Sequence, residues 1–131
     1  MHITLESDYA VRIVYCLAQN GGRLDAASIA EQTGVTLRFS LKILRKLVAA
    51  GIIRSYKGTQ GGYEIAKAPR DITLYDVITT IEGPLNISRC THPNFNCTRP
   101  KEGSCQFQKV FIELSEDIKH RLQSINFEQM M

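Results

Sequence analysis

Three of this chain's four cysteines, Cys90, Cys97 and Cys105, lie in one short segment, CTHPNFNCTRPKEGSC. Clustered thiolates can ligate a metal ion or an iron–sulfur cluster, or they can act as redox-active thiols. The C-x6-C-x7-C spacing is wider than the C-x2-C knuckles of most zinc sites. Spacing alone therefore leaves a metal site and a redox thiol set as equally good interpretations. Three thiolates are also one ligand short of the usual four.

Other residues of chemically active type have plainer interpretations. Cys16 falls in a helical pattern near its apolar side, where we expect a buried structural thiol. His92 follows Cys90 by two residues and is a lesser candidate ligand, because it would have to fold back within a turn that contains proline. The sequence suggests no Ser, His and acid set by order or motif, so we do not expect an enzyme.

Composition sets the context for this segment. The chain has 131 residues, 44% of them hydrophobic and 22% charged, which fits one soluble domain with a core. Its first residues lack the pattern of a signal peptide, and no apolar run approaches the roughly 18 residues of a membrane helix. We therefore expect a cytoplasmic protein without a membrane partner. In the reducing cytosol, clustered cysteines more often bind metal or sense redox state than form structural disulfides.

Charge is unevenly distributed along the chain. The net charge is only +3, but positions 32–63 contain six basic residues and no acidic one. The remaining ten basic residues are outnumbered by thirteen acids. A local basic surface attracts phosphate backbones, although a run of basic residues is more often only a solvated face.

Periodicity predicts a helix-turn-helix around this basic region. A first helix is expected over about residues 7–19, then a short one capped by Asp25 and closed by Gly34. Thr36 caps a third helix, LRFSLKILRKLVAA, with basic residues on one side. Its expected apolar arc consists of Leu37, Leu41, Leu44, Leu47 and Val48. In a helix-turn-helix this third helix would lie in the major groove of DNA.

The next stretch, GIIRSYKGTQGGYEIA, predicts a β-hairpin with a glycine-rich tip, which is the wing of a winged helix. Thr73 and Asp76 have capping-box spacing before LYDVITTIE, and Gly83 with Pro84 ends that helix. We expect DNA contacts from the third helix and the hairpin, at Thr36, Arg38, Phe39, Leu41, Lys42, Arg45, Arg54, Lys57, Gly58, Thr59, Gln60, Gly61 and Gly62. Of these, Arg38 and Lys42 are expected in the major groove, and the hairpin on the backbone or in the minor groove.

These patterns divide the chain into three parts. Residues 1–83 are expected to form a winged helix-turn-helix domain, and residues 84–106 a cysteine-rich loop with little to bury. Residues 107–131 are expected to form a long helix and tail. Their apolar stripe comprises Phe107, Phe111, Leu114, Ile118, Leu122 and Ile125. Because a protein that reads a palindromic DNA site benefits from twofold symmetry, we expect this helix to form a homodimer. The predicted fold is mainly α with a small β-hairpin wing.

The order of motifs resembles a known family. YAVR at 9–12, the KGxxGGY pattern within 47–69, IEG at 81–83 and the three-cysteine loop together resemble the IscR/NsrR family of bacterial iron–sulfur transcription regulators. The resemblance implies a dimeric DNA-binding regulator, expected to be a repressor. Its promoter binding would depend on the state of an iron–sulfur cluster that senses nitric oxide, redox or iron–sulfur status. A four-iron cluster is favoured over a two-iron one. The alternatives are a zinc-stapled or thiol-switch cysteine loop and, more remotely, an electron-transfer protein.

The resemblance also bears on the fourth ligand. Members that regulate cluster biogenesis have a histidine three residues after the third cysteine, where this chain has Gln108, a poor iron ligand. Members that sense nitric oxide use an acid near the N-terminus, which matches Asp8. The resemblance therefore implies Cys90, Cys97, Cys105 and Asp8 as the ligand set, with Glu6, His92 and solvent as alternatives to Asp8. Asp8 is also explained by the helix macrodipole, which favours an acid in the first turn.

Overall fold

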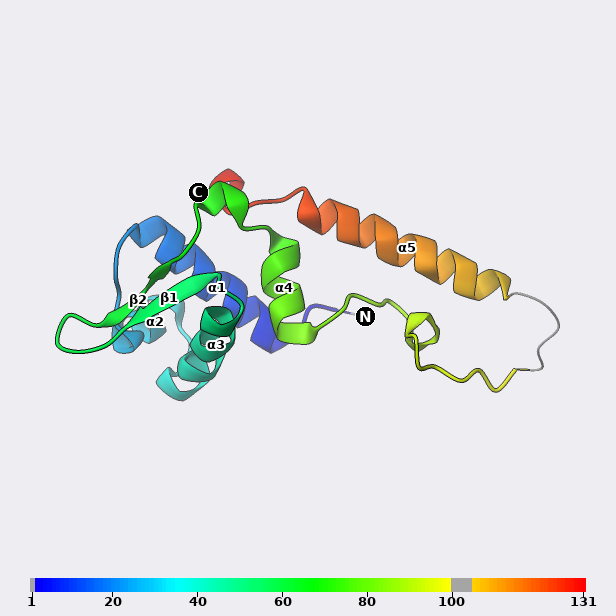
Figure 1. The fold of residues 1–131 in the computed structure, drawn as a ribbon, viewed down its shortest axis with the longest axis horizontal. Coiled ribbons are helices and arrows are strands. Elements are labelled where there is room, and N and C mark those ends of the chain that lie inside the picture. The colour runs from blue at the N-terminus through cyan, green and yellow to red at the C-terminus, as the bar shows by residue number, and fades with distance from the viewer. Residues whose placement is uncertain (1, 100–104) are drawn as a thin grey trace.

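The protein is a helical body with a small hairpin at one end and a long helix projecting from the other (Figure 1). This computed structural model describes residues 2–99 and 105–131. Its main elements are α1 (Leu5–Asn20), α2 (Ala26–Thr33), α3 (Leu37–Ala49), β1 (Ile53–Tyr56), β2 (Gly62–Ile65), α4 (Leu74–Glu82) and α5 (Gln106–Gln123). Short 3-10 segments lie at η1 (Pro69–Asp71), η2 (Arg89–Thr91) and η3 (Glu128–Met130). The predicted fold class, mainly helical with a hairpin wing, is confirmed.

Local capping chemistry explains where most helices begin. Asp25 accepts the Ser28 N–H at 2.7 Å and starts α2, and Thr36 caps α3 in the same way. The expected capping box of α4 is present, with Thr73 and Asp76 each accepting the other's backbone N–H.

The first helix begins two residues earlier than the sequence pattern predicted. Thr4 caps α1 by accepting the Ser7 N–H at 3.2 Å, so the helix includes Leu5 and Glu6. Its end is as expected, because Gly21 adopts a φ of 70° that favours glycine.

The hydrophobic core lies where α1 meets the other elements of the winged helix. One stripe of α1, comprising Ala10, Ile13, Val14 and Leu17, is buried. The residues that surround it are Ile29, Ile43, Leu44, Leu47, Ile52, Ile53, Ile72, Val77 and Phe127. Since the cluster draws residues from α1, α2, α3, α4, β1 and the C-terminal tail, one core holds α1 and α3 together.

The buried face of α3 differs from the predicted arc. Its buried residues are Ser40, Ile43, Leu44 and Leu47. Leu37 and Leu41, expected on the apolar arc, are instead 47% and 40% exposed. The observed stripe keeps the i, i+3, i+4, i+7 spacing of an amphipathic helix, but it is rotated so that the small Ser40 lies inside. Leu41 therefore lies on the same exposed side as the basic residues.

The wing is an antiparallel hairpin braced by a neighbouring linker. Its register pairs Ile53 with Ile65, Arg54 with Glu64, Ser55 with Tyr63 and Tyr56 with Gly62. Tyr63 also forms a bridge with Leu24, in the linker between α1 and α2, through backbone hydrogen bonds of 2.9 and 2.8 Å. The linker thus adds a fragment of a third strand to the hairpin.

The tail after α5 returns to the winged helix. Leu74 N–H donates to the Ile125 carbonyl at 2.9 Å, and Phe127 N–H donates to the Ile72 carbonyl at 3.0 Å. Phe127 is only 2% exposed and belongs to the main core. Residues 83–124 are consequently anchored to the same body at both ends.

The segment after α4 runs alongside α5 (Figure 1). Ile87 N–H donates to the Ser115 hydroxyl at 3.2 Å, and Gln108 donates its side-chain amide to the Cys90 carbonyl at 2.8 Å. Polar contacts with α5, rather than a core of its own, therefore hold this segment. None of the described helices is both long and apolar enough to cross a membrane.

Candidate DNA-binding surface and cysteine segment

The outer side of α3 carries the basic residues predicted to read DNA. Arg38, Lys42 and Arg45 are exposed on it, together with the two leucines displaced from the core. Thr36 and Phe39, also predicted as contacts, have structural roles here. Thr36 caps the helix, and the Phe39 ring packs edge-on against Tyr9 with centroids 5.3 Å apart.

Glu6 partly neutralises this basic face, which the sequence patterns did not reveal. Its carboxylate lies 2.7 Å from the Lys46 ammonium and 3.8 Å from that of Lys42. Glu6 belongs to the first turn of α1, so the contact joins α1 directly to α3. Lys46 is accordingly engaged within the protein, whereas Arg38 and Arg45 have no ion pair among the described residues.

The wing exposes a polar tip. Lys57, Gly58, Thr59 and Gln60 are exposed there. Arg54, also exposed, donates to the Ala66 carbonyl at 3.2 Å across the hairpin. The tip and the outer side of α3 thus supply cations and hydrogen-bonding groups of the kind that contact DNA backbones.

Close backbone contacts within the protein require glycine at positions 61 and 62. A Cβ on Gly61 would lie 2.6 Å from the Tyr56 carbonyl oxygen, and one on Gly62 would lie 2.6 Å from that of Leu24. Gly62 also has a φ of 143°, which side-chain-bearing residues rarely adopt. The sequence predicts that these glycines allow close approach to DNA, and their close approach to the protein's own backbone is an independent explanation.

Arg23, in the linker between α1 and α2, contacts the wing although no sequence motif singled it out. Its guanidinium carbon lies 3.4 Å from the centre of the Tyr56 ring. Its Nη1 donates to the Gln60 carbonyl at 3.2 Å. Both partners are distant in sequence, so only the fold brings this contact about.

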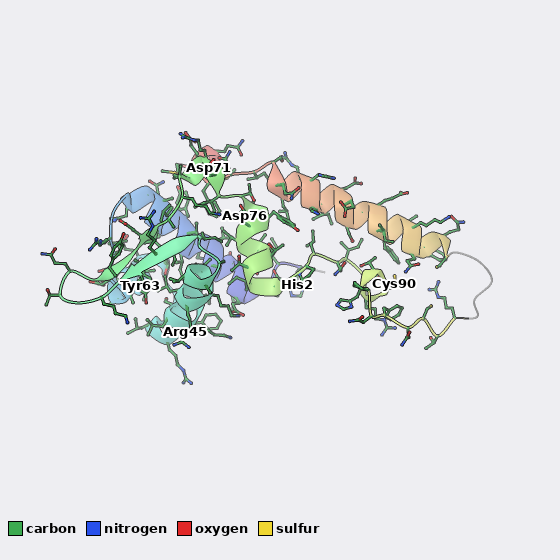
Figure 2. The ribbon with its side chains drawn as sticks, viewed as in Figure 1. His2, Arg45, Tyr63, Asp71, Asp76 and Cys90 are labelled. Carbon is green, nitrogen blue, oxygen red and sulfur yellow. The ribbon has the colours of Figure 1, made fainter. Side chains whose placement is uncertain are left out.

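The cysteine segment lies away from the elements predicted to read DNA. Figure 2 shows Cys90 beneath α5, well separated from Arg45 on α3. The Cys90 sulfur lies 3.2 Å from the Ser88 hydroxyl, and Cys97 is exposed. Gln108 contacts the backbone carbonyl of Cys90 rather than its sulfur.

Cys105 occupies the N-cap position of α5. No side-chain hydrogen bond closes this cap, but the backbone N–H groups of Gln108 and Phe107 and the nearby Arg99 favour a negative charge on sulfur. The N–H of Gln108 is the largest cause, and together these groups lower the pKa of the Cys105 thiol. The Arg99 guanidinium lies 3.8 Å from the sulfur. These groups therefore favour the thiolate form of Cys105.

The predicted ligands are not gathered in a single copy of the chain. Within residues 2–99 and 105–131, no three His, Cys, Asp or Glu side chains form a group that could hold a metal ion. Asp8 pairs with Arg12 at 2.8 Å, on the same helix. His92 uses its Nδ1 to accept the Asn94 N–H. Part of the cysteine segment, residues 100–104, lies outside the described residues.

Cys16, expected to be a structural thiol, is half-buried between α1 and α2, and its sulfur contacts the Gln32 side-chain oxygen at 3.5 Å. Burial raises the pKa of this thiol. Cys16 therefore has the opposite electrostatic environment to Cys105.

Relatives of known class match the chain over almost its whole length. The model of the Rrf2 family, described as an iron-dependent transcriptional regulator, matches residues 3–131. A putative rrf2-like HTH-type transcriptional regulator of Rhodobacter capsulatus is 32% identical over 139 residues, covering 98% of this chain and 91% of the relative. The HTH-type transcriptional regulator IscR of Aliivibrio salmonicida is 26% identical, covering 100% of this chain and 77% of that protein.

Solved structures agree with this relationship. The structure of T. potens IscR superposes with a TM-score of 0.79 at 28% identity, covering 99% of this chain and 85% of that one. CymR, described as the global cysteine regulator of B. subtilis, also has a TM-score of 0.79, covering 99% of this chain and 95% of that one, but at 23% identity it supports the fold alone. The chain belongs to the Rrf2 family of helix-turn-helix transcriptional regulators, which bind DNA and are not enzymes.

Proposed function

We propose that this protein is a repressor that binds a palindromic operator as a homodimer, and that its promoter binding is controlled by an iron–sulfur cluster held in the cysteine segment. The signal would be nitric oxide, redox state or iron–sulfur status, and the site of action the cytoplasm. The observation that carries the proposal is the combination, in one Rrf2-family chain, of an exposed basic helix beside a wing and a three-cysteine segment attached to α5.

DNA binding follows from the outer side of α3. In the proposed complex α3 lies in the major groove, where Arg38 and Lys42 reach base edges or phosphates and Leu41 contacts a thymine methyl group. Lys57 and Thr59 at the wing tip contact the backbone or the minor groove. Arg45 and Arg54, exposed beside them, extend the basic surface.

The exposed side of α5 supports the homodimer. Phe107, Val110 and Leu114 are 63%, 49% and 43% exposed and recur at i, i+3 and i+7 on one face. Of the predicted stripe only Phe107 and Leu114 are on this face, because Phe111, Ile118, Leu122 and Ile125 are half-buried within the chain. On another side of α5, the Ser115 hydroxyl accepts a hydrogen bond from the Ile87 N–H in the segment before Cys90. The helix therefore has one side covered by that segment and one exposed apolar side. A second copy of α5 would cover the latter, and the resulting twofold axis suits a palindromic operator.

The donor set fits an iron–sulfur cluster chemically. Cys90, Cys97 and Cys105 are free thiols, and the lowered pKa of Cys105 favours the thiolate that iron requires. The proposed fourth ligand, Asp8, would come from the second subunit, because the candidate ligands form no single group among the described residues of one chain. It would have to leave its ion pair with Arg12 to reach iron. Such a cluster, four-iron rather than two-iron, would supply a centre that reacts with nitric oxide or oxygen.

The deciding experiment is anaerobic purification followed by absorption spectroscopy and analysis of iron, acid-labile sulfide and zinc. We expect a brown protein with iron and sulfide, and operator affinity that differs between the cluster-bound and cluster-free forms. A colourless protein with one zinc ion per chain would contradict the cluster proposal while leaving DNA binding to be measured separately.

Asp8 has its own test. Carboxylate is a harder and weaker ligand for iron than thiolate. Asp8→Ala should therefore give a labile cluster, and Asp8→Cys one that reacts more slowly with nitric oxide in stopped-flow absorption. Arg12→Ala is the control, since it breaks the Asp8–Arg12 pair without removing the carboxylate. Equal reaction rates for the parent, Asp8→Ala and Asp8→Cys would remove Asp8 from the site.

The environment of Cys105 favours one alternative, a thiol switch without metal. A thiol of lowered pKa is the species that peroxides and disulfides oxidise first. In that case operator affinity of the metal-free protein would change on peroxide treatment and recover with a dithiol reductant. The cluster proposal expects instead that metal-free protein responds little to peroxide.

A further inference from the structure

The structure assigns Arg23 to the DNA-binding machinery as a positioning residue. We propose that Arg23 fixes the position of the wing tip relative to α3, so that the wing enters its DNA groove in a shape already set in the free protein. This inference rests on the proposed function, namely that α3 and the wing contact one operator half-site together.

The linker that carries Arg23 is held firmly against the hairpin. Leu24 and Tyr63 exchange two backbone hydrogen bonds, and the Cα of Gly62 packs so closely on Leu24 that no side chain would fit. Arg23 is next to this bridge in the chain. Its backbone is therefore fixed with respect to β2, and its side chain extends from a defined point.

The guanidinium makes two different contacts with the wing. Its face stacks on the Tyr56 ring, with the guanidinium carbon 3.4 Å from the ring centre, and its Nη1 donates to the Gln60 carbonyl at 3.2 Å. Tyr56 is the last residue of β1 and Gln60 lies in the exposed tip. One side chain thus links the base of the hairpin loop to its tip.

The Tyr56 ring that supports this stack is itself fixed. Its hydroxyl donates to the Glu64 carboxylate at 2.5 Å, across the hairpin. At the tip, the Gly61 N–H donates to the Gly58 carbonyl at 3.0 Å. Arg23 therefore connects two rigid points, the Tyr56 ring and the Gly58–Gly61 turn.

This arrangement uses chemistry specific to arginine. A planar guanidinium can stack through its face while donating hydrogen bonds through its edge, which an ammonium cannot do. Lysine at position 23 would keep the positive charge but lose the geometry. Positioning and simple attraction to phosphate can therefore be told apart by one substitution.

The expected effect on DNA binding is pre-organisation. A wing tip held in place before binding loses less conformational freedom when it contacts DNA. Because a cation–π contact of this closeness and one hydrogen bond are lost, we expect Arg23→Ala to weaken operator binding by about tenfold.

The test compares Arg23→Ala and Arg23→Lys with Arg70→Ala, which removes an exposed positive charge from η1 without touching the wing. Hydrogen exchange of the free proteins is followed over residues 57–62. Operator affinity and hydroxyl-radical protection of the DNA are measured with the same samples. We expect faster exchange of the tip with both Arg23 variants, weaker binding, and loss of protection only where the wing meets DNA. Arg70→Ala should change none of these beyond a small salt-dependent loss of affinity.

Two outcomes would overturn the proposal. One is tip exchange in Arg23→Ala equal to that of the parent; the other is full recovery of exchange and affinity in Arg23→Lys, which would make Arg23 a charge alone. If the parent protein protects no operator DNA, it is the proposed function that fails, and the exchange of the free protein still decides whether Arg23 holds the wing.

Discussion

Ser40 is a buried hydroxyl that has no hydrogen-bond partner among the described residues. It lies on the inner side of α3 with 0% exposure. An unpaired buried polar group destabilises a fold, so Ser40→Ala should raise the free energy of unfolding by about 1 kcal/mol. Urea denaturation followed by circular dichroism measures this.

Ser7 is the matched control for Ser40. It is equally buried, but its hydroxyl donates to the Glu82 carboxylate at 2.6 Å and so links α1 to α4. Ser7→Ala should lower the free energy of unfolding by about 1 kcal/mol. Equal changes for the two serines would mean that their hydrogen-bonding states do not differ as described.

The lowered pKa of the Cys105 thiol leads to a second prediction at the scale of single residues. With a lowered pKa, Cys105 should alkylate with iodoacetamide at neutral pH faster than Cys16, whose pKa is raised by burial. The alkylation rate of Cys105 should therefore rise at lower pH than the alkylation rate of Cys16. Mass spectrometry on cluster-free protein measures both rates.

The Arg99 side chain provides the control for that profile. Arg99→Gln removes the cation beside the sulfur and should move the Cys105 profile to higher pH, whereas Lys109→Gln, which removes a cation from the first turns of α5, should not. If Arg99→Gln leaves the profile unchanged, the guanidinium does not act on this thiol.

At the scale of elements, Glu6 connects α1 with α3. Glu6→Gln frees Lys46 and Lys42 from a carboxylate that competes with phosphate. We expect tighter operator binding with a steeper salt dependence, by up to about 0.9 unit per freed cation in the slope of log K against log salt, because each freed cation can displace a DNA counterion. Asp117→Asn on α5 removes an equal charge remote from α3 and should have little effect. A weaker affinity of Glu6→Gln would show that Glu6 holds α3 in place rather than screening it.

Elements were predictable from the sequence where their causes are local. The caps at Asp25, Thr36 and Thr73 depend on partners three residues away, and all three are present. The wing and the terminal helix follow from periodicity. The inner face of α3 was only partly predicted: Leu44 and Leu47 are buried as expected, but Ser40 and Ile43 are buried where Leu37 and Leu41 were expected.

Site contacts were less predictable because they join distant positions. Glu6 meets Lys46 across 40 positions and Arg23 meets Gln60 across 37, and no local pattern encodes such a pairing. The basic face of α3 was visible in advance, but what neutralises it was not. The ligand set of the cysteine segment remains a prediction.

At the scale of the whole molecule, the exposed apolar side of α5 leads to the last prediction. Val110→Glu with Leu114→Glu should convert the proposed dimer to a monomer in light scattering, since buried charges at a helix interface are strongly destabilising. The winged helix should stay folded, because neither residue belongs to its core. Gln123→Glu adds a charge to the opposite face of α5 and should leave the dimer intact. Dimers that persist in the double variant would place the interface elsewhere.

Both ends of the segment from 83 to 124 are fixed to one core, through α4 on one side and Ile125 and Phe127 on the other. When both ends of a flexible loop are fixed, doubling the length of the loop lowers the free energy of unfolding by only about 0.6 kcal/mol. Insertions or deletions between Cys90 and Cys105 should therefore change the stability of the fold little. The segment proposed to carry the sensor could then change in length without altering the DNA-binding domain.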